Sequence, residues 1–191
     1  MEYINLSSPQ IGLSMLPACP RPFRGTLALL LATATLPAAA AHLEVQGGRS
    51  YMDSYGANTA FVEAIFAPHA IGDSGRLDWS PDVSAGWIDS RDVARYRGDA
   101  YGTDHAVALV AAGARFHYGD AGAWYRPLFF SFQLAGTSQT TQALSTHYQF
   151  VSTLGWQGEH LSFQIRHISN GSLHKPNRGE TMALVGVGFD L

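Results

Sequence analysis

Apolar and polar residues alternate in short stretches along the chain after about residue 41. In segment 128–134, for example, one face carries Leu128, Phe130, Phe132 and Leu134. A period of two residues indicates β-strands with one apolar face. Eight such units are predicted, separated by clusters of turn-forming residues, at about 43–52, 58–68, 76–90, 104–118, 124–136, 144–157, 160–170 and 180–191.

Eight antiparallel strands are compatible with two architectures. A soluble sandwich or barrel would bury the apolar face, whereas an outer-membrane barrel turns that face toward lipid and lines its interior with polar residues. Strands of about 10 residues suit a membrane crossing. Aromatic residues also gather toward strand ends, as an interfacial girdle requires: Trp79, Trp87, Trp124, Tyr125, Tyr148 and Trp156. We therefore predict an all-β fold, an eight-stranded antiparallel transmembrane β-barrel of the bacterial outer membrane.

The first 41 residues follow a different pattern. Arg21 and Arg24 precede an uncharged run, 25–41, that ends in four alanines. This arrangement predicts a secretory signal peptide at 1–41, cleaved near Ala41, followed by a single barrel domain at 42–191. A transmembrane helix is the weaker alternative, because the run is shorter than the roughly 20 residues that a span needs. The stretch before Arg21 is long for a signal, so Met15 is an alternative start.

Charge and cysteine content narrow the function classes. Cleavage would remove Glu2, Arg21 and Arg24, leaving 10 basic and 14 acidic side chains of the 12 and 15 in the chain. A net negative charge gives no support to nucleic-acid binding. The one cysteine, Cys19, would leave with the signal, so no disulfide and no thiolate metal site is expected.

Candidate chemistry lies at the end of the predicted strand 160–170. Its apolar row, which runs through Leu161 and Ile165, continues into His167 and Ser169. Residues two apart on a strand share a face at roughly 6.6 Å, which lets the imidazole approach the hydroxyl and activate it. If the barrel spans a membrane, parity turns this pair toward lipid and turns Arg166 inward, where an ion pair is expected. The alternative is that both are ordinary polar residues at the membrane interface.

The segment 167–180 resembles the signature of the PagL family, the outer-membrane lipid A 3-O-deacylases. A His-x-Ser-Asn stretch is followed by a loop with a Pro-Asn pair and then by an acidic residue, and these features are His167 to Asn170, Pro176–Asn177 and Glu180. The resemblance is strong over about the last thirty residues. Upstream it depends on strand number, size and signal peptide.

The resemblance implies an esterase that hydrolyses the 3-O-linked acyl chain of lipid A, the membrane anchor of lipopolysaccharide, in the outer leaflet. Ser169 would be the nucleophile, His167 the general base and then acid, and Asn170 and Asn177 the oxyanion donors, with no cofactor and no metal. Membrane lipids would surround the barrel wall. A homodimer would be natural for the family, and nothing in the sequence pattern argues for one.

The acidic member of the triad departs from the family pattern. In the family it lies fourteen residues after the histidine, a position that Thr181 occupies here, while Glu180 lies one residue earlier. A one-residue slip turns a strand side chain to the opposite face. We expect the loop to absorb this slip so that Glu180 still orients His167. The alternative is that the orienting acid is absent.

Two further questions stay open at this stage. Lys175 and Arg178, on the loop beside the pair, could contact lipid A phosphates or could be ordinary solvated charges. The whole chain could also be a non-catalytic structural or binding barrel of the outer membrane. The His167-x-Ser169 pair with its two asparagines favours the esterase, since a structural barrel has no need of them.

Overall fold

The computed structural model describes residues 42–191, so the predicted signal peptide at 1–41 lies outside the described part. The described elements are β1 (His42–Met52), β2 (Tyr55–Ile65), β3 (His69–Ile71), β4 (Leu77–Ile88), the 3-10 helix η1 (Ala94–Tyr96), β5 (Val107–Tyr118), β6 (Leu128–Thr137), β7 (Tyr148–Gln157), β8 (Leu161–Ser169) and β9 (Glu180–Asp190). In this part of the chain no helix is long and apolar enough to cross a membrane.

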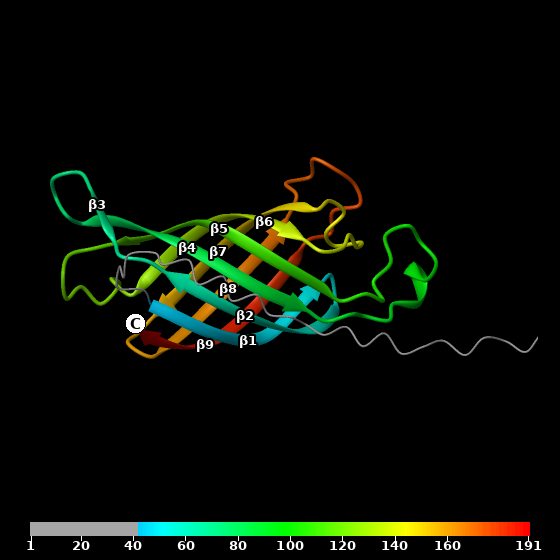
Figure 1. Cartoon of the computed structure of the whole chain (residues 1–191), viewed down its shortest axis with the longest axis horizontal. Coiled ribbons are helices and arrows are strands. Elements are labelled where there is room, and N and C mark those ends of the chain that lie inside the picture. The colour runs from blue at the N-terminus through cyan, green and yellow to red at the C-terminus, as the bar shows by residue number, and fades with distance from the viewer. Residues whose placement is uncertain (1–41) are drawn as a thin grey trace, which may run out of the picture. The chain divides into compact units, whose positions relative to one another are not determined.

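Eight of the strands close into an antiparallel barrel. Neighbours follow the order β2-β1-β9-β8-β7-β6-β5-β4, and pairing of β2 with β4 joins the two edges. The barrel confirms the predicted fold (Figure 1). The short strand β3 pairs with β4 alone; it lies directly after the predicted strand 58–68 and was not predicted. Pro68, which has no N–H to donate to a ladder, lies between β2 and β3.

The burial pattern is that of a membrane barrel rather than a soluble one. Along β8 the apolar Phe163 and Ile165 are 52% and 63% exposed, whereas Gln164 and Arg166, which alternate with them, are buried. The same alternation holds along β6 and β9. Exposed aromatic side chains mark both ends of the wall: Tyr51, Trp87 and Tyr148 at one end, and Tyr118, Trp124 and Trp156 at the other. Apolar side chains therefore face outward and polar ones inward, as predicted.

Buried charges fill the middle of the interior. Arg166 donates to Glu63 at 2.7 Å, and Arg115 approaches the other oxygen of Glu63 at 3.2 Å and Glu44 at 3.5 Å. All four side chains are buried, and Asp82 lies 3.7 Å from Arg115 in the same cluster. Buried charges are tolerated when they are paired in this way. The expectation that Arg166 is an interior ion-pair partner is confirmed.

The two ends of the barrel differ. The loop end carries the connections 53–54, 89–106, 138–147 and 170–179, while β1 begins and β9 ends at the opposite, terminal end (Figure 1). Buried apolar side chains at the loop end include Val93 and Tyr96 from one loop and Leu144 from another, which pack in one cluster with Met52 and Ile168 of the strands. The loops thus close the interior at this end, and a large ligand would meet the barrel from outside.

Candidate active site on the outer wall

His167 and Ser169 lie on the outer face of β8, at the loop end. His167 pairs with Thr181 of β9 on one side and with Ser152 of β7 on the other, and Ser169 pairs with Phe150. His167 is exposed and Ser169 is half-buried. In residues 42–191 no direct hydrogen bond joins the two side chains. Contacts of this kind are often long in a free enzyme and shorten when substrate binds.

Thr181, not Glu180, is the neighbour that holds His167. The Nδ1 atom of His167 lies 2.9 Å from Oγ1 of Thr181, directly across the β8–β9 ladder. A proton on Nδ1, donated to the threonine hydroxyl, would leave Nε2 as the basic nitrogen; we assign this tautomer from the contact. The threonine hydroxyl orients the ring but carries no negative charge to offset an imidazolium.

Glu180 points into the barrel. Arg91 donates a hydrogen bond to each of its carboxylate oxygens, at 2.6 and 2.7 Å, and the Ser50 hydroxyl donates a third at 2.5 Å. Glu180 is 2% exposed. The expectation that the loop absorbs the one-residue slip is therefore wrong. β9 already begins at Glu180, which pairs with Ile168, so the pleat turns its side chain to the face opposite His167.

The two asparagines occupy different positions from those expected of a pair of oxyanion donors. Asn170 is fully buried, and its side-chain N–H donates to Oγ of Ser145 at 3.1 Å and to the carbonyl of His174 at 3.0 Å. Its amide therefore ties two loops together inside the barrel end. Asn177 is half-buried and accepts the backbone N–H of Asn170 at 3.2 Å through Oδ1.

Gly179 is a site residue that the sequence reasoning missed. It is buried at a φ of 72°, and a Cβ built there would lie 2.8 Å from Cε1 and 3.2 Å from Nε2 of His167. A glycine is required so that the imidazole can occupy this space. Glu180 pairs with Ile168, so Gly179, one residue earlier, lies near the end of β8 that carries Ser169. The Cε1–Nε2 edge of the His167 ring, which Gly179 approaches, is therefore on the Ser169 side. The glycine itself is the one feature of the sequence that indicates this positive φ.

An apolar groove of about 790 Å³ runs along the outer wall below the pair. Two small residues, Gly47 of β1 and Ala183 of β9, line it between larger side chains, among them Phe163, Ile165 and Val185. A Cβ at Gly47 would meet no atom within 4 Å, so the floor is open. Ala183 pairs with Ile165, the outward residue next to His167 on β8. The groove therefore leads from the row that carries His167 toward the middle of the wall.

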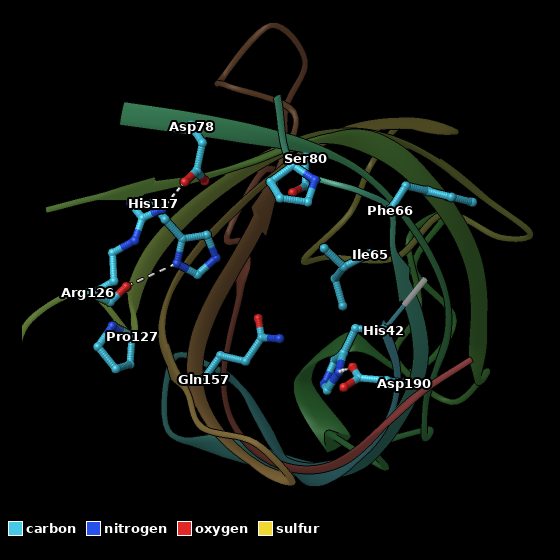
Figure 2. Close-up of a pocket in the computed structure, with 11 residues that line it drawn as sticks. His42, Ile65, Phe66, Asp78, Ser80, His117, Arg126, Pro127, Gln157 and Asp190 are labelled. Atoms are coloured by element: carbon cyan, nitrogen blue, oxygen red, sulfur yellow. Dashed lines mark hydrogen bonds and ion pairs between the residues drawn. The ribbon is translucent and has the colours of Figure 1, made fainter. Parts of the chain in front are cut away.

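The pocket at the terminal end is remote from this pair. Its volume is about 450 Å³, and Figure 2 shows His42 and Asp190 on one side and Asp78, His117 and Arg126 on the other. Its charged groups pair with one another: His42 contacts Asp190 at 2.6 Å, and Arg126 forms an ion pair with Asp78. No group of three or more metal-ligating side chains occurs among residues 42–191.

A closed barrel with an apolar exterior and a polar interior is the architecture of outer-membrane proteins, and the histidine and serine at its rim are residue types that ester hydrolysis uses. The family model for PagL, lipid A 3-O-deacylase, matches residues 73–190, and the chain belongs to this family. The resemblance expected from segment 167–180 is thereby confirmed and extends back to the β3–β4 turn. Comparison with curated proteins and with solved structures gives no match.

Proposed function

We propose that this protein hydrolyses the 3-O-linked acyl ester of lipid A in the outer leaflet of the bacterial outer membrane, with Ser169 as nucleophile and His167 as base. One observation carries the proposal: both residues face outward at the loop end of β8, next to an apolar groove. Longer loops face the cell exterior in barrels of this type, and the longest connection, 89–106, is at this end. The pair is then level with the outer leaflet.

The reaction proceeds in two halves. Nε2 of His167 takes the proton of Ser169 as Oγ bonds to the ester carbonyl carbon, and the collapse of the tetrahedral intermediate breaks the bond to the sugar 3-oxygen. That oxygen leaves with the proton from His167, and an acyl-enzyme remains. Water, deprotonated by His167, then attacks the acyl carbon, and Ser169 recovers its proton as the free fatty acid departs.

Thr181 acts as a positioning residue in this scheme. Its hydroxyl accepts the Nδ1 proton of His167 and so presents Nε2 toward Ser169, with Gly179 packed against the ring edge. The oxyanion donors are the side-chain N–H of Asn177 and backbone N–H groups of the loop that begins at Gly171. Asn170 supports them indirectly, because its backbone N–H holds Oδ1 of Asn177.

The groove supplies the binding energy for the acyl chain. A chain that lies along Gly47, Ala183 and Ile165 replaces bulk lipid with a shaped apolar surface and places its ester near His167. Contacts of this kind position the reacting carbonyl, and correct positioning contributes several orders of magnitude to rates in enzymes generally.

The test is expression of the chain in a host that makes full-length lipid A. Mass spectrometry of extracted lipid A should show the loss of one 3-O-linked acyl chain. Ser169→Ala and His167→Asn should abolish this loss, while heat-modifiable migration on gels shows that both variants still form barrels. If the folded protein left the lipid A profile unchanged, the chain would be a non-catalytic barrel and the proposal would fail.

A further inference from the structure

Arg49 places a positive charge on the outer wall. The outward positions of β1 are Val45, Gly47, Arg49 and Tyr51, and Arg49 is exposed among them. Charged side chains on the lipid-facing side of a barrel are destabilising, and more so the deeper they lie. An arginine kept at such a position calls for a compensating partner.

No carboxylate provides that partner in the described chain. Nη1 of Arg49 donates to the neutral side-chain oxygen of Asn58 at 2.7 Å, and residues 42–191 contain no ion pair that includes Arg49. Two other arginines near this rim already have an anionic partner, since Arg95 and Arg178 share one oxygen of Asp53 at 3.2 and 2.7 Å. Arg49 therefore has N–H donors and a full charge to offer to a ligand.

The guanidinium of Arg49 is directed toward the loop end. A Cβ built at Gly56 would lie 2.7 Å from Nη2 of Arg49, so the side chain occupies space that only a glycine leaves open. Gly56 pairs with Tyr51, which is nearer to the loop end than Arg49 is. Arginines near the ends of membrane segments extend in this manner toward the head-group level.

Arg49 also borders the groove described above. It lines the groove together with Gly47 and Ala183, and Ala183 is its partner on β9. The row of Arg49 is adjacent to the row of Tyr51, Thr181 and His167. Two strand spacings across and one row along place the Cα atoms of Arg49 and His167 about 12 Å apart. That span is within the reach of one sugar phosphate head group and an arginine side chain.

We propose that Arg49 binds a phosphate of the glycolipid head group and so fixes where the substrate lies along the groove. The inference rests on the proposed function, because it assigns a recognition contact to the same site. Guanidinium groups bind phosphate through paired, charge-assisted hydrogen bonds, and such contacts are stronger than neutral ones. Arg178 and Arg95 are less suited, because both already form an ion pair with Asp53.

The experiment measures kcat/KM of the purified barrel in a neutral detergent, so that the substrate is the sole source of phosphate. Substrates are bisphosphorylated lipid A, the two forms that lack one phosphate each, and the fully dephosphorylated form. Arg49→Met should lower kcat/KM for bisphosphorylated lipid A by about 10- to 100-fold. For the dephosphorylated form it should stay within about twofold of the wild type, and the monophosphorylated form that is still affected identifies the phosphate bound.

Arg49→Met is expected to fold, because methionine suits a lipid-facing position better than arginine does. Arg49→Lys should recover part of the lost kcat/KM, and Arg95→Met, which removes a rim arginine that already pairs with Asp53, should match the wild type. Equal losses on phosphorylated and dephosphorylated lipid A, or no loss on either, would overturn the phosphate site. With either of these two outcomes, hydrolysis of the lipids by the wild-type protein would still support the proposed function.

Discussion

Glu180 and Thr181 are adjacent in sequence and are expected to respond to mutation in opposite ways. Replacing Glu180 by Gln removes the charge that Arg91 grips through two hydrogen bonds of 2.6 and 2.7 Å. Replacing Thr181 by Val removes the hydroxyl that holds Nδ1 of His167. We therefore expect the first change to lower stability with little effect on catalysis, and the second to lower catalysis with little effect on stability.

The magnitudes follow from burial. Glu180 is 2% exposed and the Arg91 side chain 8%, so Glu180→Gln leaves a buried guanidinium without its anion. Breaking a buried pair from one side costs about 3–5 kcal/mol, and the remaining amide hydrogen bonds place this change near the lower value, about 3 kcal/mol. The Thr181 contact is neutral and exposed, so its loss is worth about 0.5–1.5 kcal/mol, which corresponds to a decrease in kcat of about twofold to twelvefold.

Two assays separate the effects. Urea unfolding in detergent, followed by tryptophan fluorescence, gives the free energy of unfolding, and release of fatty acid from lipid A gives kcat and KM. Thr181→Ser keeps the hydroxyl and should restore most of the activity that Thr181→Val loses. A kcat for Glu180→Gln lowered by more than about 100-fold, with unfolding unchanged, would mean that Glu180 acts on His167 after all and would refute the geometry.

Three further changes test the site. Gly179→Ala should lower kcat by at least about tenfold in the fatty-acid assay, because its Cβ would lie 2.8 Å from the His167 ring at a φ of 72°; an unaltered kcat would show that the ring position is not critical. Ala183→Phe should fill the groove and raise KM for long acyl chains but not for short-chain esters, and an equal effect on both would argue against the groove. Asn170→Ala should lower the free energy of urea unfolding by about 1–3 kcal/mol, since it removes one hydrogen bond to the neighbouring loop and one within its own, whereas a stable variant would show that the loops hold without it.

Much of the fold was predictable because the strands of the barrel wall alternate apolar outward residues with polar inward residues. The outward position of His167 and Ser169 followed from their parity with Ile165, and the inward ion pair of Arg166 followed from the same rule. Strand ends were less predictable. Residues 144–147 were placed in a strand, yet β7 begins at Tyr148, because Leu144 packs under the loops instead of joining the ladder.

The failure over Glu180 has a definite physical cause. Parity along β9 correctly turned Glu180 inward, but the position where the ladder begins depends on contacts with a distant segment. Arg91, from the connection after β4, is the buried partner of Glu180, and no local sequence pattern predicts that ion pair. The groove escaped prediction for the same reason, because Gly47 and Ala183 become neighbours only when β1 pairs with β9.

The outer-wall position of Ser169 has a consequence for how turnover is counted. A substrate that stays in the leaflet reaches the wall by lateral diffusion in two dimensions, so its concentration is a mole fraction of the surrounding lipid rather than an amount per volume of water. Dilution of lipid A with inert lipid should then slow the enzyme even when the total amount of lipid A is constant. Under the proposed function, crowding and fluidity of the outer leaflet would then influence the rate, because the membrane would be the medium in which the reaction takes place.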